Sequence, residues 1–303
     1  MATLATIDDF AEDLRRQVND ALINMGFSVP PGLDVRKSCV VFFKILGRTI
    51  SMRPRTVKRS AELSARTLTP YQTTALHTIQ AESLAGDNLN HRLTRQFWKA
   101  DFDDFLLSDW NIQHLHIGPP NIGPKGLSGG MSELLYVMVL PDEIYFIDLL
   151  DHHAFAEQNL VEIVHTNWPE IIEPYRVRAD LHFGRSPTAE ERAQARKAGL
   201  TMFLQVADGT IYRPMGGGQA TSRDSVRAVE RADSLCNEVA HFHALCSHYF
   251  NEIARQFKAC TSLEPTKFHL HVDFSEPARL CLQLKEHPSG QIVSPVMAPR
   301  ANT

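Results

Sequence analysis

The chain has 303 residues, of which 43% are hydrophobic and 22% are charged, so disorder is not the expected state. This length allows one large domain or two to three small ones, and a net charge of −4 excludes an overall basic surface but permits a local basic patch. The five cysteines never form a Cys-x-x-Cys pair, which argues against a disulfide scaffold or a cysteine zinc site. The apolar runs are too short to span a bilayer and the N-terminus has no signal pattern, so we expect a cytoplasmic protein without a membrane partner.

The first segment, residues 1–70, is predicted to hold a helix, a strand and a basic stretch. Apolar residues at helical spacing predict a helix from Ile7 to Met25, which Pro30–Gly32 terminates. The run Cys39–Leu46 has the composition of a strand.

Basic side chains cluster after that run and again near two further predicted helices, Tyr71–Ala85 and Leu93–Lys99. Cations bind backbone phosphates, and the neighbouring aromatic residues could stack on bases. We therefore expect this set to contact nucleic acid. Its members are Lys44, Arg48, Arg53, Arg55, Lys58, Arg59, Arg92 and Arg95.

The central segment, residues 71–175, carries three consecutive strand candidates, NIQHLHIG, SELLYVMVL and EIYFIDLL. Pro141–Glu143 forms a turn between the second and third, and a long Gly- and Pro-rich loop joins the first and second. We expect the three strands to pair as an antiparallel meander. A helix is predicted over Phe155–Asn167.

Two histidines two positions apart mark the first strand as the floor of a functional site. Side chains alternate along a strand, so His114 and His116 should project from one face. In a meander the third strand runs parallel to the first, which should bring His152 and His153 to the same sheet edge. Imidazole can act as a general base, a general acid or a metal ligand. The structural alternative is that one histidine is exposed and the other is a core residue, with His152 and His153 at a helix start.

Aspartate residues lie close in the sequence to these histidines and to a second pair of histidines. Asp148 and Asp151 are candidates for orienting an imidazole ring. In FHLHVDF, His269 and His271 again share a strand face, with Asp273 in phase.

The last segment, residues 176–303, is predicted to be an α+β extension. SPTAEERAQARKAG predicts a helix, and LTMFLQV and TIYRP predict a hairpin around Asp208–Gly209. One long helix or two are expected over Ser222–Cys260, followed by a closing pair of strands. The glycines of Gly216–Gln219 are more typical of a flexible loop than of a phosphate-binding turn. The tail, residues 288–303, is expected to be disordered.

The order of elements over residues 70–170 resembles that of ribosome-dependent RNase toxins of the RelE/HigB type. A helical segment precedes a strand with His-Leu-His, a Gly-rich turn, ELLYVMV and EIYFIDLLDHHAF. The resemblance implies N-terminal helices on a small antiparallel sheet and metal-free acid/base cleavage of RNA. Such sites commonly carry a basic residue on the second strand, which SELLYVMVL lacks, and Lys125 in the preceding loop is the nearest candidate.

The sequence therefore predicts an α+β protein with a central small antiparallel sheet, N-terminal helices and an α+β C-terminal extension. We expect it to bind and cleave RNA without a cofactor, in a setting such as bacterial or phage defence, with a cognate inhibitor protein as a further partner. One strand histidine would take the ribose 2′-hydroxyl proton, and one histidine after the third strand would protonate the leaving oxygen. Lys125, with Arg92 or Arg95, would stabilise the phosphorane. The candidate catalytic residues are His114, His116, His152, His153 and Lys125.

Alternatives from other classes stay open. One is a non-catalytic nucleic-acid- or protein-binding module whose histidines are structural. Another is a two-histidine phosphoesterase-like enzyme using His114 and His269, with His116 and His271 in place of the hydroxyl residues of that family's two His-x-Ser/Thr elements. A metal site is also conceivable, but no His-Glu-x-x-His motif, cysteine pair or carboxylate cluster with ligand spacing marks one.

Overall fold

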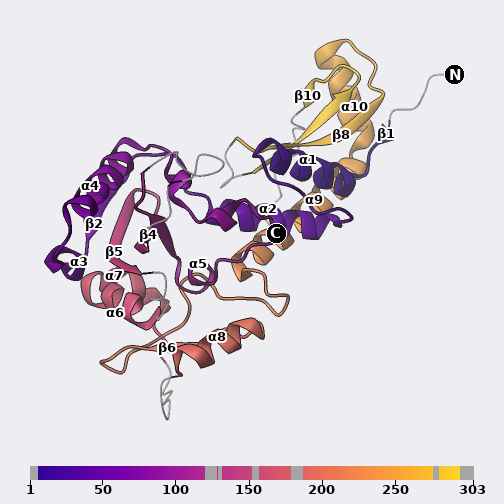
Figure 1. The fold of residues 1–303 in the computed structure, drawn as a ribbon. Helices are drawn as coiled ribbons and strands as arrows, with labels where there is room; N and C mark the ends of the chain where they lie inside the picture. Colours follow the sequence, from indigo (N-terminus) through magenta and orange to yellow (C-terminus); the bar gives the residue numbers. More distant parts are fainter. Residues whose placement is uncertain are drawn as a thin grey trace. The chain divides into compact units, whose positions relative to one another are not determined.

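The computed structural model describes residues 6–119, 128, 132–151, 157–178, 187–275 and 280–293, which form the α+β fold expected from the sequence. The chain divides into two compact units: unit 1 comprises Met1–Leu46 and Glu230–Thr303, and unit 2 comprises Gly47–Val229. In Figure 1 the indigo and yellow segments of unit 1 lie side by side. This division differs from the predicted boundaries near residues 70 and 175. None of the described helices is long and apolar enough to cross a membrane.

The larger sheet of unit 2 contains the three predicted central strands in strand order β2-β5-β4-β3. Strands β3, β4 and β5 form the expected antiparallel meander, while β2 pairs parallel with β5. His116 lies opposite Leu134, which in turn lies opposite Leu150, so the C-terminal ends of β3 and β5 share one sheet edge. The strands are β2 (Thr56–Arg59), β3 (Ile112–His116), β4 (Glu133–Val139) and β5 (Glu143–Asp151).

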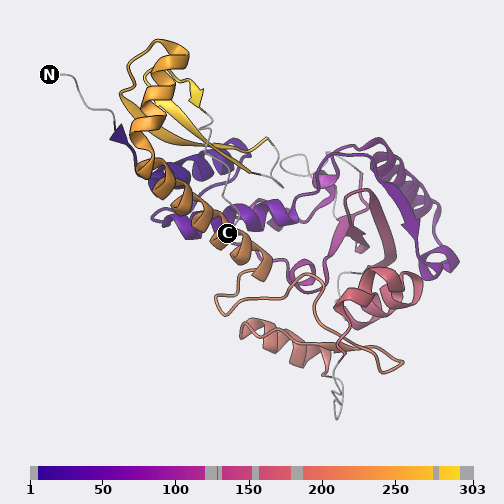
Figure 2. The ribbon, with the colours of Figure 1, turned by 180° about the vertical axis from the view of Figure 1, so that it is seen from behind.

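Helices pack around this sheet in unit 2. In both views α4 lies beside β2, and α6 lies against β5 (Figures 1 and 2). Leu160 and Val164 of α6 join Leu134 and Tyr136 of β4 in one buried apolar cluster. Burial of such side chains contributes roughly 1.5–3 kcal/mol each. The helices are α3 (Ala61–Ala65), α4 (Pro70–Ala85), α5 (Phe105–Trp110), α6 (Glu157–Asn167), α7 (Pro169–Ile172), α8 (Ala189–Lys197) and the 3₁₀ helix η4 (Glu173–Tyr175).

Helix α4 shows why the sequence predicted its ends well. Thr69 and Gln72 form a reciprocal capping box, and Pro70 occupies the first turn. The helix stops at Gly86, whose φ of 80° is left-handed and whose missing Cβ would lie 2.6 Å from the backbone nitrogen of Pro54.

Two local predictions were wrong. The run Cys39–Leu46 belongs to a helix, α2 (Val35–Arg48), because Cys39, Phe42 and Phe43 recur on one buried helical face despite their strand-like composition. The predicted helix Leu93–Lys99 is replaced by a short 3₁₀ helix, η2 (Arg95–Trp98), which follows another one, η1 (Leu89–Arg92). The side chains of Asn88 and Thr94 cap them separately.

The hairpin of β6 (Leu204–Gln205) and β7 (Ile211–Tyr212) turns around Asp208 and Gly209, as predicted. The glycines that follow lie in a loop, as the sequence predicted, and one of them packs closely against α5. Gly216 is buried and its amide donates to the Asp109 carbonyl at 2.8 Å. A Cβ at Gly216 would lie 2.2 Å from the Ser108 carbonyl oxygen, so only glycine fits against the end of α5.

Unit 1 contains a second sheet, with strand order β1-β8-β9-β10. Its inner face, with Phe268 of β8, packs on α10 through Phe257, whose ring centroid lies 5.7 Å away. Figure 2 shows α10 in front of these strands. The elements are β1 (Thr6–Ile7), α1 (Phe10–Asn24), α9 (Val226–His248), α10 (Phe250–Thr261), β8 (Lys267–Asp273), β9 (Cys281–His287) and β10 (Ile292–Val293).

The sequence expected one helix or two before this sheet, and α9 and α10 are two. It also expected the closing strand pair, β8 and β9. Within the predicted disordered tail, residues 288–293 are ordered enough to form a turn and β10, which pairs with β9, and residues 294–303 lie outside the described residues.

Candidate functional site

The two histidines of β3 form the first part of the candidate site. Alternation along the strand directs His114 and His116 to one face, and their ring centroids are 6.3 Å apart. His114 is buried, with 7% of its surface exposed, whereas His116 is half-buried. His116 is therefore the more accessible of the two imidazoles.

Tyr136 of β4 connects this pair to the end of β5. It lies opposite His114 in the sheet, with ring centroids 6.2 Å apart. Its hydroxyl donates to the carbonyl oxygen of Asp151 at 3.4 Å. Burial, with smaller contributions from the charges of Asp151 and Asp104, raises the pKa of Tyr136 to about 12. The phenol is therefore a hydrogen-bond donor at neutral pH.

Asp151 is the last described residue of β5, and the chain then leads into the other predicted histidines. His152, His153 and Lys125 lie outside the described residues. What the structure brings to the histidine face is the backbone of Asp151, through Tyr136.

The Arg92 side chain holds the C-terminal end of β3, the strand that carries His114 and His116. Only 1% of its surface is exposed, and its guanidinium makes two hydrogen bonds to the Glu82 carboxylate, at 2.6 and 2.7 Å. The same guanidinium donates to the carbonyl oxygens of His116 and Gly118, at 3.3 and 3.4 Å. A planar fork with several donors suits this combination of acceptors. Arg92 thus fixes the backbone of the half-buried histidine.

Asp104 is a site residue that the sequence did not single out. Its carboxylate caps α5 by accepting from the Leu107 amide at 3.1 Å. Burial raises the pKa of Asp104 to about 6, although the cap hydrogen bonds and the charge of Arg48 oppose this shift. Its charge also contributes to the raised pKa of Tyr136, so the two groups are neighbours. The only sequence signal was its place as an N-cap before Phe105 in an acidic link.

The N-terminal turn of α4 lines the same sheet edge. The hydroxyl of Tyr71 donates to the carbonyl oxygen of Ile117 at 3.1 Å, directly after the histidine strand. The amide of Gln72 donates to the Glu133 carboxylate at 2.6 Å, and Glu133 lies opposite Asp151. Tyr71 is partly exposed and could contact a ligand at this edge.

Asp148 has a different role from the one expected. Its buried carboxylate accepts two hydrogen bonds from Arg66, at 2.9 and 2.6 Å, and one from the Leu149 amide. This pair ties the segment after α3 to β5 and does not orient a described histidine.

Three of the predicted phosphate-binding arginines are buried and held by protein acceptors. Arg48 donates to the carbonyl oxygens of Phe97, Lys99 and Phe102, and burial lowers its pKa to about 10. Arg55 donates to the carbonyl oxygens of Ser51 and Leu140. Together with Arg92, these groups would have to leave their acceptors to reach a phosphate.

The other members of that set are more accessible. Lys44 is half-buried in unit 1, while the rest belong to unit 2. Arg53 pairs with Asp142, and Lys58 lies 3.7 Å from Glu143. Arg59 donates to the Gln80 side chain at 2.7 Å, and Arg95 is exposed. The binding of nucleic acid by this set stays a prediction.

The chain matches no family model, no curated protein and no solved structure. The two histidines of the phosphoesterase alternative, His114 and His269, belong to different units.

We expect Arg92→Met to lower the free energy of unfolding by roughly 3–5 kcal/mol, because it leaves the Glu82 carboxylate without its buried partner. Arg95→Met, at the exposed neighbour, should change it by no more than about 0.5 kcal/mol. Chemical denaturation measures both. Adding Glu82→Gln to Arg92→Met should restore part of the lost stability. Equal losses of stability in Arg92→Met and Arg95→Met would contradict a structural role for the pair of Arg92 and Glu82.

Carboxyl NMR should show Asp104 titrating near pH 6. The folded state favours its protonated form, so stability should fall as pH rises from the unfolded value of 3.8 to about 6 and be constant above. Asp104→Asn should remove this dependence, while Asp101→Asn, at an exposed position, should preserve it. A titration midpoint of Asp104 near the ordinary value of an aspartate would contradict the claim that burial raises its pKa.

Proposed function

We propose that unit 2 cleaves RNA by acid/base chemistry on the ribose 2′-hydroxyl. The observation that carries the proposal is the position of Tyr136, between the ring of His114 and the backbone of Asp151. This contact joins the histidine pair to the chain segment that leads directly into His152 and His153.

The chemistry needs two proton-transfer groups on one surface. A base removes the 2′-hydroxyl proton, the freed oxygen attacks the adjacent phosphorus, and the 5′-oxygen leaves with a proton from an acid. His116 is our choice of base, because it is less buried than His114 and its backbone is fixed by Arg92. His152 or His153 would supply the acid, as the sequence suggested.

Tyr136 keeps its proton at neutral pH because its pKa is raised to about 12, and its hydroxyl donates to the Asp151 carbonyl. Because the Tyr136 side chain is fully buried, we assign it the role of holding the end of β5 beside the histidines of β3, and not of contacting the phosphate. Lys125 and Arg95 are the cations that we assign to the phosphate, since Arg92 is engaged by Glu82.

A non-catalytic binding module is the second candidate. The burial of Arg48, Arg55 and Arg92 favours its protein-binding form, because it removes three cations from the surface that would hold RNA. A setting in bacterial or phage defence, with an inhibitor protein as partner, is part of our proposal and derives from the toxin resemblance alone.

We expect His116→Ala to reduce RNA cleavage by at least about 100-fold, the lower bound for loss of a general acid or base. His77→Ala, at an exposed histidine of α4, is the matched control and should leave the rate unchanged. Cleavage of a labelled RNA, with and without ribosomes and with and without EDTA, measures the effect. Inactivation by EDTA with recovery on adding metal would contradict acid/base chemistry, and RNA binding without cleavage would favour the binding module.

A further inference from the structure

The outer face of β8 in unit 1 carries a second histidine pair that the proposed function does not use. Residues of β8 alternate in burial, so Phe268 and Leu270 enter the core while His269 and His271 lie on the other face. Lys285 of β9 lies directly opposite His269. The His287 ring centroid is 5.9 Å from that of His269. Three imidazoles and a lysine therefore share one sheet face.

Helix α1 closes the side of this face by bonding the open edge of β8. The Gln17 side chain accepts from the Val272 amide at 2.9 Å and donates to the Leu270 carbonyl at 2.7 Å, as a neighbouring strand would. Asp13 accepts from the Leu270 amide at 2.9 Å. These bonds fix α1 against β8 and place Arg16 at the rim.

The result is an open pocket of about 680 Å³ in unit 1. This volume lies within the range of sites for small organic ligands. Its lining includes Arg16, His269, His271, Lys285 and His287. The lining carboxylate, Glu286, is buried and already accepts from the amides of Thr266 and Ser289.

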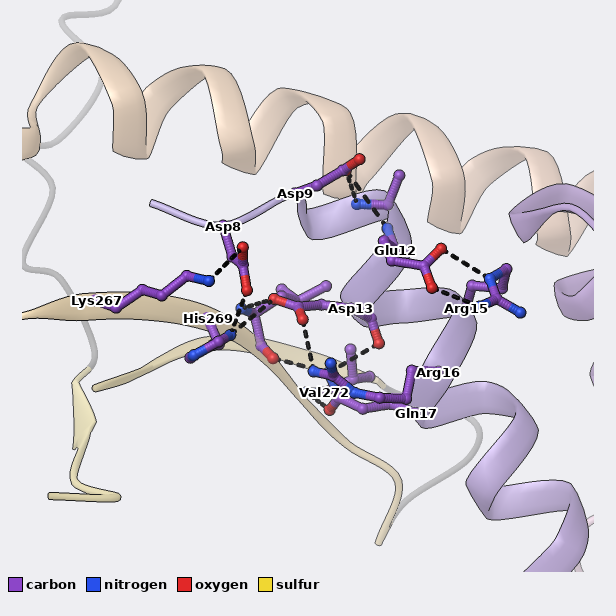
Figure 3. Close-up of polar contacts among 12 residues, drawn as sticks. Asp8, Asp9, Glu12, Asp13, Arg15, Arg16, Gln17, Lys267, His269 and Val272 are labelled. Carbon is purple, nitrogen blue, oxygen red and sulfur yellow. Dashed lines mark hydrogen bonds and ion pairs between the residues drawn. The ribbon is translucent and has the colours of Figure 1, made fainter. Parts of the chain in front are cut away.

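Asp8 orients His269. Its carboxylate lies 2.8 Å from Nδ1 of the ring, and Figure 3 shows the other ring nitrogen pointing away from the two carboxylates. This arrangement leaves Nε2 for a ligand. Figure 3 also shows Lys267 at Asp8 and Arg16 beside Asp13.

Asp8, Asp13 and His269 also have the spacing of metal ligands. However, Lys267 lies 2.8 Å from Asp8, and Arg16 lies 2.6 Å from Asp13, so both carboxylates are neutralised by protein cations. A metal ion would have to displace these partners. We therefore treat the carboxylates as groups that orient His269 and not as ligands.

We propose that this pocket binds the phosphate group of a nucleotide-sized ligand. Protonated imidazole, the Lys285 ammonium and the Arg16 guanidinium supply donors to several oxygens of one anion, and charge-assisted bonds of this kind are strong. Among the described residues, Lys285 has no carboxylate partner. The volume beyond that of a phosphate leaves room for the rest of a nucleotide. This site is separate from the histidines of β3, and the inference does not depend on RNA cleavage.

An anion bound by these side chains favours the protonated form of the imidazoles, so binding should be tighter at lower pH. The titratable and charged groups around His269 come from β8, β9, α1 and the segment that precedes α1. They are Asp8, Asp13, Arg16, Lys267, His271, Lys285, Glu286 and His287.

Calorimetry on the full chain tests the proposal with inorganic phosphate, adenosine 5′-monophosphate and adenosine as probes, at about pH 6 and about pH 8. We expect both phosphate-bearing probes to bind, more tightly at the lower pH, and adenosine not to bind. His269→Gln and Lys285→Gln should each weaken nucleotide binding by about tenfold, the loss of one charge-assisted bond. Lys285 is exposed and its replacement should not affect folding.

Lys258→Gln is the matched control, because Lys258 is an exposed lysine of the same unit that pairs with Glu264. It should bind the nucleotide as the parent does. No binding of either phosphate-bearing probe, or equal binding by the parent and both pocket variants, would overturn the proposal. Stoichiometric zinc binding that His269→Gln abolishes, without a response to phosphate, would overturn it in favour of a metal site.

Discussion

The buried ion pair between Arg92 and Glu82 fixes the end of the strand that carries both candidate histidines. Strand β3 is an edge strand, so the carbonyl groups on its open side need donors from elsewhere in the fold. Arg92 provides them for His116 and Gly118 while it stays neutralised by Glu82. A lysine could not make the same set of planar contacts.

The rest of the candidate site follows from this fixed edge. The meander sets β3 and β5 parallel, so their ends meet, and Tyr136 bridges the histidine face to Asp151. Asp104 and α5 directly precede β3 in the chain, and Gly216 packs closely against the C-terminal end of α5. The buried His114 ring lies beside the protonated Tyr136 phenol, and the half-buried His116 follows on the same strand face. Unit 1 repeats the use of a paired carboxylate, with Asp8 orienting His269.

Sequence patterns identified several elements, whereas burial of charge was not predictable. Runs rich in β-branched and aromatic residues identified β3, β4 and β5, and helical spacing of apolar residues identified α1. The run in α2 has strand-like residues, and only its packing made it helical. Arg48 looked like part of a basic surface but donates to three backbone carbonyls, because folding brings distant acceptors to it. The carboxyl of Asp104 escaped notice for the same reason. The toxin resemblance stays a prediction.

The central claim is that the histidine face of unit 2 transfers protons to and from a ribose 2′-hydroxyl and a leaving oxygen. The ends of the RNA fragments test it most directly, because attack by the 2′-oxygen and attack by water leave different products. Mass spectrometry of fragments made by the full chain should find 2′,3′-cyclic phosphate and 5′-hydroxyl ends. Fragments with 3′-hydroxyl and 5′-phosphate ends would contradict the claim.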